Sequence, residues 1–566
     1  MELLKAPALT RRLVASESFD SHDAFGHGIF QKKTMLLLII SVFVLNSQAR
    51  VIKLIAGDVD HWCRPPPNYN MSATIWTKEF IPVEADGKPS RCLFYKYHPD
   101  FNHTELTACQ EWEYDASTAG RTIVSYWNLV CHRRVLLVAA LAVQSSGGVL
   151  CIAAGPIADY VGRAPVIRVV AGLLVISTVA NCFVTSYAIY VTVRFFTACF
   201  ANVNGMLCAL ILFEITTHEN RPRHIIIAGA IGLFIADVWF PIFTLIHLNW
   251  VWKQALYLSP AFLSLSTYFV VQESPRWLIS QGNYNAAENV MLEGARLNGF
   301  PLPNTACLLK RLREQECDIN LGCLSDQKRA LDDCPLLRRE LIMILSFFSL
   351  LFAFHVSVFS GTSGSPALFR LVSSCVIVLA YTAMHHLIVR VPLVKVLWLC
   401  YLLLSVIQSL LAIAVHLQPK IITEILLMLS KAGVYVALVT SIAYIMELVP
   451  TTVRASALLV VFGCGRAGSV CAFVFYALQK MGRKDLAFFL AALLLFLALL
   501  ALQFLPQATQ VECAKIYTRR ESALRRQAMD HMKKTLEPSK SGKSFRESAK
   551  STPRPRCISA RPTPQT

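Results

Sequence analysis

The chain has 566 residues, of which 55% are hydrophobic and 16% charged, with a mean hydropathy of +0.48 and a net charge of +18. A soluble chain of this length would form several domains with about a quarter of its residues charged, so the composition excludes that class and indicates a membrane protein. The excess charge does not indicate a nucleic-acid partner, because residues 507–566 alone hold 14 Lys and Arg against 5 Asp and Glu.

Twelve apolar segments follow one another along the chain. Each is about 20 residues long, the length that crosses a hydrocarbon layer about 30 Å thick. The eighth segment is weakened by Ser373, Ser374 and His385, and the first starts too late and is too long for a secretory signal. We predict an all-α membrane protein with twelve transmembrane helices, near 34–55, 135–156, 166–186, 188–213, 225–246, 251–271, 341–360, 366–388, 393–415, 421–446, 455–478 and 485–505.

Clusters of Lys and Arg mark one side of the membrane. The positive-inside rule places that side in the cytoplasm. Twelve spans return the chain to it, so we expect both termini, 1–33 and 507–566, to be cytoplasmic. The short loop from Lys480 to Lys484 lies on the opposite side and breaks the rule. The clusters are Lys32 with Lys33, Arg163 with Arg168, Arg221 with Arg223, and the segment 273–339.

Independent support for this topology comes from the loop between the first two spans, residues 57–132. It holds both N-x-S/T sequons of the chain, at Asn70 and Asn102, and four cysteines. Sequons and an even number of cysteines in one polar segment fit an extracellular, oxidising location. We therefore predict two glycans and two disulfides, with three possible pairings among Cys63, Cys92, Cys109 and Cys131.

Two further polar segments are predicted to lie in the cytosol. The segment 273–339 links two groups of spans, and its cysteines lack metal-ligand spacing, so we expect free thiols and no metal site. The tail 507–566 is rich in Ser, Pro and Lys and is expected to be disordered, with attraction to anionic membrane lipid as an alternative to simple solvation. The cysteines in question are Cys307, Cys317, Cys323 and Cys334.

The chain is built twice. Arg163-Ala-Pro165 follows the second span, and Arg390-Val-Pro392 follows the eighth. Glu214 and Arg221, seven residues apart, close the fourth span, as Glu447 and Arg454 close the tenth. The offsets are nearly equal, so we predict two six-helix halves, 34–272 and 340–506, in the layout of a major facilitator transporter.

The charged residues at these helix ends are expected to form ion pairs. A buried ion is costly unless it is paired, so Asp159, Arg163, Glu214 and Arg221 can bridge to one another or to the opposite half. Pairs that form in one state and break in the other bias an alternating-access equilibrium. The alternative is that these are ordinary interfacial charges that fix the topology.

These residues resemble those of the organic cation/anion/zwitterion transporters, solute carrier family 22, over about residues 24–509. The entry sequence 25–31 (FGHGIFQ), the loop ending 109–131, GPIADYVGRAP (155–165), ESPRWL (273–278) and ELVPTTVR (447–454) carry the resemblance. Ala164 stands where the family usually has a second basic residue, and the motif after the eighth span keeps only 389–392. The resemblance implies a gate made of Asp159, Gly162, Arg163, Glu214, Arg221, Glu447 and Arg454.

Arg466, in the middle of the eleventh span, bears on the charge of the substrate. An ionisable residue there costs about 2.5–3.5 kcal/mol on insertion scales and normally faces a cavity or a partner. The resemblance implies an anionic substrate, because the family's anion carriers have arginine here and its cation carriers have aspartate. A guanidinium also suits a carboxylate or sulfate. The alternative is a structural pair with an interior acid such as Asp237.

Other binding residues are implied by the same resemblance. Lys431 adds positive potential, and three side chains of the seventh span fall where the family has pocket aromatics: Phe352, Phe354 and His355. Apolar walls with few polar anchors suit amphiphilic ions, although plain packing explains such aromatics equally well. Val378 replaces a lysine of the anion carriers, and Arg50 and Lys53 either compensate for it or snorkel outward.

The sequence thus predicts a plasma-membrane transporter of small organic ions that works by alternating access. Organic anions, exchanged for a counter-anion, are the expected substrates, with no cofactor and no nucleic-acid partner. An enzyme is not expected, because no nucleophile–base pair, metal motif or phosphate loop stands out. The alternatives are a cation or carnitine-like zwitterion carrier, a sugar porter, and a transport-inactive receptor or scaffold. No oligomeric state follows.

Overall fold

The computed structural model describes most of the chain outside its ends and its longest loops. Asn70, Asn102, the four cysteines of the segment 273–339 and the tail 507–566 lie outside the described residues, so the predictions made for them stay predictions. The described ranges are 24–57, 59–65, 73–83, 89–98, 103–114, 121–217, 220–301, 336–360, 367–417, 419–480 and 484–505.

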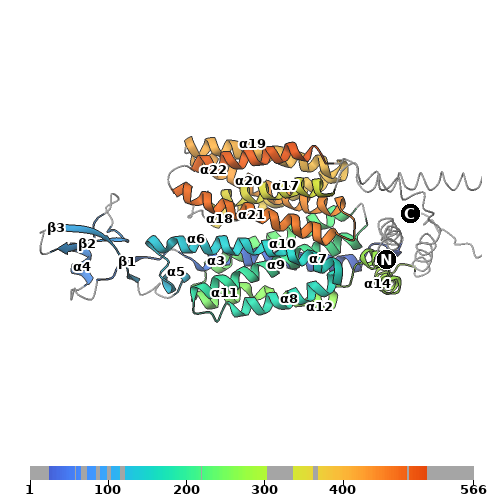
Figure 1. Cartoon of the computed structure of the whole chain (residues 1–566), viewed down its shortest axis with the longest axis horizontal. Helices are drawn as coiled ribbons and strands as arrows, with labels where there is room; N and C mark the ends of the chain where they lie inside the picture. Colours follow the sequence, from blue (N-terminus) through green and yellow to red (C-terminus); the bar gives the residue numbers. More distant parts are fainter. Residues whose placement is uncertain are drawn as a thin grey trace, which may run out of the picture.

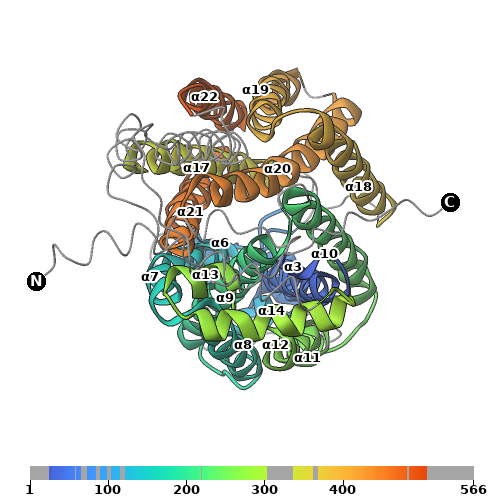
Figure 2. The same ribbon diagram turned by 90° about the vertical axis from the view of Figure 1, so that its right-hand side faces the viewer.

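Two bundles of long helices lie side by side, with their axes roughly parallel (Figures 1 and 2). The first bundle contains α3 (Ile29–Ile55), α6 (Arg134–Ser146), η2 (Gly147–Leu150), α7 (Cys151–Val161), α8 (Arg163–Ala180), α9 (Tyr187–Ile215), α10 (Arg221–Thr244), α11 (Trp250–Leu258), η3 (Ser259–Ser266) and α12 (Thr267–Val270). The second contains α17 (Leu336–Ser360), α18 (Ala367–Arg390), α19 (Leu393–Leu417), α20 (Lys420–Leu448), α21 (Arg454–Lys480) and α22 (Lys484–Leu502).

Every predicted span coincides with helical structure. Ten stretches within the described residues are long and apolar enough to cross a membrane. The sixth span is not among them; it is made of α11, a 3₁₀ segment with Pro260 and α12, and polar residues such as Lys253 and Gln254 lower its hydropathy. The eighth shows only the shorter apolar stretch Val372–Ile388. The prediction of an all-α membrane fold with two six-helix halves is confirmed.

The loop between the first two spans folds into a small unit that projects from one end of the bundles (Figure 1). Strand β1 (His61–Cys63) pairs antiparallel with β4 (Trp112–Tyr114), and β2 (Leu93–His98) pairs antiparallel with β3 (His103–Ala108). Its short helices are α4 (Ala73–Glu79), α5 (Ile123–Tyr126) and η1 (Cys131–Arg133). We call this end of the molecule the β end and the opposite end the gate end.

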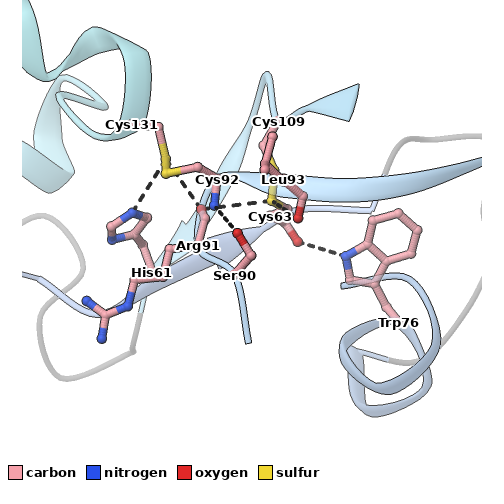
Figure 3. Close-up of a disulfide and its surroundings, with 9 residues drawn as sticks. All are labelled: His61, Cys63, Trp76, Ser90, Arg91, Cys92, Leu93, Cys109 and Cys131. Atoms are coloured by element: carbon pink, nitrogen blue, oxygen red, sulfur yellow. Dashed lines mark hydrogen bonds between the residues drawn. A yellow bond between two sulfur atoms is a disulfide. The ribbon is translucent and has the colours of Figure 1, made fainter. Parts of the chain in front are cut away.

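Two disulfides tie this unit together (Figure 3). They join Cys63 to Cys109 and Cys92 to Cys131, which selects one of the three pairings that the sequence allowed. The buried indole of Trp76 donates a 2.9 Å hydrogen bond to the carbonyl of Cys63 and so packs α4 against the first disulfide. All four predicted cysteines are therefore paired in the structure.

Small residues bring the two halves into close contact. A Cβ on Gly155 of α7 would lie 2.7 Å from Cα of Ser456 in α21, and one on Gly463 would lie 2.6 Å from the side chain of Ile152. Helices in membranes associate through such close backbone approach, because apolar area alone gives no driving force in lipid. The seam between α7 and α21 is the surface on which the gate is built.

The segment after the sixth span covers the gate end of the first half. It forms α13 (Pro275–Ser280) and α14 (Tyr284–Asn298), and α14 runs across that end (Figure 2). The side-chain amide of Asn298 accepts from the N–H of Phe30 and donates to the carbonyl of Phe25, both at 2.9 Å. This clamp holds the motif 25–31 at the start of α3.

Candidate functional site

The gate end of the seam holds a buried network of ions from both halves. Nη2 of Arg163 lies 3.0 Å from Oδ1 of Asp159 and 3.6 Å from Oε1 of Glu214. The same Oε1 of Glu214 lies 3.2 Å from Nη1 of Arg454, which belongs to the second half. Glu214 and both arginines are fully buried. Glu214 therefore binds one guanidinium from each half.

Asp159 crosses the seam to the first turn of α21. Its carboxylate accepts hydrogen bonds from the N–H of Ala455 at 3.2 Å, and from the N–H and hydroxyl of Ser456 at 2.7 and 2.6 Å. The first N–H groups of a helix lack partners within the helix and carry partial positive charge. A carboxylate of the first half thus caps a helix of the second half.

Glu273 also belongs to this network, although it was not among the residues predicted from the sequence. Its carboxylate accepts from the N–H groups of Arg163 and Ala164, both at 3.1 Å, and so caps α8. Gly162 has φ +116°, and a Cβ there would lie 2.5 Å from Oε2 of Glu273. Burial raises the pKa of the Glu273 carboxyl. The sequence contains a signal for such a contact. The residue before α8 is Gly162, which has no side chain to cap the helix, so an acceptor from elsewhere in the chain is expected.

Equivalent residues of the two halves make equivalent contacts at the gate end. Nε of Arg221 donates to the carbonyl of Thr216 at 3.1 Å, and Nε of Arg454 donates to that of Val449 at 3.0 Å, so each arginine binds the end of the helix before it. Glu447 is buried within electrostatic range of both arginines. The structure therefore brings all seven predicted gate residues together.

Arg466 lies deeper in the seam and contacts the first half. Its Nη2 donates a 2.6 Å hydrogen bond to Oδ1 of Asn202, and its guanidinium lies 4.7 Å from the ring centre of Phe462. A Cβ on Gly148 would lie 2.7 Å from Cγ of Arg466, so this glycine makes room for the stem. Nε of Arg466 is buried without a hydrogen-bond partner among the described residues.

Arg466 does not form the structural pair with Asp237 that was the alternative. Asp237 instead forms an ion pair with Arg50 of its own half and contacts Nζ of Lys431 of the other half at 3.9 Å. The hydroxyl of Ser374 donates to Oδ2 of Asp237 at 3.0 Å. Arg50 thus turns inward rather than snorkelling outward. We call Arg50, Asp237, Ser374 and Lys431 the Asp237 cluster.

The three predicted aromatic positions of α17 have different surroundings. Phe352 is buried in the second half, with its ring centre 5.6 Å from that of Phe475, so packing explains it. Phe354 is half-buried and lies 5.3 Å from the ring of Tyr435. His355 lies within electrostatic range of Arg466, and its Nδ1–H donates a 2.9 Å hydrogen bond to the Leu351 carbonyl. The structure places His355 near Arg466 and leaves Phe352 in the core.

Residues 131–516 match the family described as sugar (and other) transporter. The chain belongs to the sugar (and other) transporter family. The match covers the second to twelfth spans and therefore includes both halves and the gate.

Curated relatives within this family are members of solute carrier family 22, which confirms that resemblance. The chain is 26% identical over 521 residues to organic cation/carnitine transporter 2 of Mus musculus, an alignment that covers 85% of this chain and 89% of the relative. It is 25% identical over 346 residues to solute carrier family 22 member 6 of Mus musculus, covering 58% of this chain and 62% of that protein.

Solved structures support the fold. The xylose symporter XylE bound to 6-bromo-6-deoxy-D-glucose matches with a TM-score of 0.61 at 14% identity, over 85% of this chain and 98% of that one. The human organic anion transporter MFSD10 matches with a TM-score of 0.50 at 12% identity, over 84% of this chain and all of that one. This sugar (and other) transporter family member is a multi-pass membrane transporter with the major facilitator fold.

Proposed function

We propose that the protein transports organic anions across the plasma membrane by alternating access, with Arg466 as the anchor for the anionic group. The observation that carries this proposal is the charge balance of the interior. Asp237, the acid in the middle of the described spans, is neutralised by two cations. Arg466 binds only a neutral amide through Nη2, and its buried Nε has no hydrogen-bond partner among the described residues. The interior therefore has capacity for a negative charge.

In this proposal the gate end faces the cytoplasm, together with both termini, and the β end faces outward. The charge bias of the loops supports this orientation, as do the sequons and disulfides of the β end. The structure then represents a state that is closed toward the cytoplasm, because Glu214 and Asp159 join the halves there.

The membrane potential favours a mechanism in which one anion is exchanged for another. An anion that enters a cell with a negative interior opposes about 2.3 kcal/mol per charge per 100 mV, which is roughly a fortyfold concentration bias at about 1.4 kcal/mol per decade. A carrier that accumulates anions therefore needs a counter-anion that leaves. We propose that Arg466 binds the two anions in turn.

The test uses vesicles that contain the full-length protein. Labelled aromatic carboxylates and sulfonates should be taken up, while tetramethylammonium, carnitine and xylose should not, and a preloaded dicarboxylate should accelerate anion uptake. Arg466→Asp should abolish this acceleration. Full anion exchange by this variant would show that Arg466 is a structural charge. Uptake of the cation, the zwitterion or the sugar in place of anions would support those alternatives, and uptake of none of them would favour a receptor or scaffold.

The relatives' names do not decide between these alternatives, because they include a cation/carnitine transporter. The Asp237 cluster argues against a cation site, since Arg50 and Lys431 neutralise the carboxylate that such a site would need. The buried charges of the seam also argue against a sugar porter. A neutral sugar carries no charge that could balance Arg466. The free-energy cost of placing this arginine inside a span would then not be offset by substrate binding.

A further inference from the structure

The Asp237 cluster joins the two halves through two contacts, of which the one with Lys431 is weak. Asp237 lies in α10 of the first half, where Arg50 of α3 holds it by an ion pair. Ser374 and Lys431 reach it from α18 and α20 of the second half. The lysine contact is the loosest of these, because its N–O distance is 3.9 Å, well beyond the 2.7–3.2 Å of a hydrogen bond.

The side chain of Lys431 is also less buried than that of Asp237. The side chain of Asp237 is 6% exposed, whereas that of Lys431 is 29% exposed. Lys431 is therefore the more accessible partner, and its flexible side chain can swing away while Arg50 and Ser374 keep the carboxylate in place. The Asp237 carboxylate partly balances the positive charge of Lys431. Without it, the lysine ammonium would be desolvated and would have no ionic partner here.

The cluster and Arg466 belong to one electrostatic environment. Tyr435 of α20 lies within electrostatic range of Arg50, Asp237 and Arg466. Arg50, Lys431 and Asp237 together carry one net positive charge, and Arg466 adds another, so an incoming anion meets a surplus of positive charge. An organic anion that reaches both Arg466 and Lys431 therefore competes with Asp237 for the lysine ammonium.

We propose that Asp237 is a built-in competitor of the substrate: its carboxylate occupies Lys431 when no substrate is bound and yields the lysine to an organic anion. This inference rests on the proposed function and names a residue that sets its affinity. Because Lys431 and Asp237 lie in different halves, the exchange of partners also removes a contact between α10 and α20. Occupancy of the site would thereby loosen the halves, which is a differential interaction of the kind that shifts a conformational equilibrium.

The experiment measures initial rates of labelled benzoate uptake by full-length protein in vesicles, normalised to the amount of inserted protein. Asp237→Asn should lower the half-saturation concentration about tenfold, or about 1.4 kcal/mol, because Lys431 no longer has a competing carboxylate. Asp237→Glu keeps the competitor and should stay near the wild type. Lys431→Gln combined with Asp237→Asn should remove the gain. Asp485→Asn, at the start of α22, is the matched control for loss of one acid.

If Asp237→Asn fails to insert, Arg50→Gln with Asp237→Asn removes the ion pair as a unit and still releases Lys431. An unchanged or higher half-saturation concentration in the variant that inserts would overturn the inference, as would a gain that survives Lys431→Gln. Absence of uptake of every aromatic carboxylate by the wild type would instead overturn the proposed function, so the two failures are distinguishable.

Discussion

Glu214 binds one arginine from each half of the molecule. It is fully buried and binds Arg163 from its own half and Arg454 from the other. A buried carboxylate is costly unless its charge is matched, and here the match requires both halves to be in place. The Val449 carbonyl that Arg454 also binds belongs to the second half, so it is the contact with Glu214 that links Arg454 to the first half.

At the same scale, Glu273 fixes the starting point of α8. We expect Glu273→Gln to lower maximal transport and to reduce stability by about 1 kcal/mol, because an amide caps the N–H groups of Arg163 and Ala164 less well than a carboxylate does. Thermal unfolding in detergent and maximal uptake rates measure the two effects.

Glu293→Gln on the exposed face of α14 serves as the control for this variant and should change neither quantity. Unchanged stability and transport in Glu273→Gln would show that α8 does not need this cap. The sequence departure at Ala164 has little effect on this contact, because residue 164 contributes its backbone N–H and not its side chain.

Helix ends are the elements that carry the gate. The end of α7 meets the start of α21, and Asp159 supplies acceptors for three donors there. The second half differs, because Arg390, which corresponds to the buried Arg163 in the repeat, is exposed at the end of α18. The described gate is thus asymmetric, with its ionic contacts concentrated on one of the two related seams.

We expect Asp159→Asn to reduce maximal transport severalfold with less than a threefold change in half-saturation concentration. The amide has one acceptor oxygen in place of two and no charge, so the cap on α21 weakens and the state closed at the gate end becomes less populated. Initial uptake rates over a range of substrate concentrations separate the two parameters. Arg390→Gln is the control and should behave like the wild type. A large loss of affinity with normal turnover would place Asp159 in the substrate site instead.

At the scale of the whole molecule, the two ends of the bundles perform different tasks. The gate end is rich in buried ions and covered by α13 and α14, whereas the β end carries a disulfide-linked unit of two small sheets (Figure 1). Disulfides persist in an oxidising compartment, so the β end lies outside the cell and the gate end on the cytoplasmic side in the proposed orientation.

This orientation predicts glycans at the two sequons of the β end. Endoglycosidase treatment of the protein from expressing cells should lower its apparent mass, and Asn70→Gln with Asn102→Gln should abolish that shift. Each single variant should remove part of it. A shift that survives the double substitution would show that the glycans lie elsewhere and that the orientation is wrong.

The spans and the two halves were predictable from the sequence, because hydropathy, length and local motifs depend on neighbours along the chain; the gating role of the charged residues at the helix ends stays a prediction. The tertiary structure alone decided which charges pair. Glu214 binds Arg454, 240 residues away, and Asp237 binds Arg50 and Lys431 rather than Arg466. Such pairs depend on how helices pack, and similar charges on several helices leave many pairings open. The disulfide connectivity and the role of Glu273 were open for the same reason.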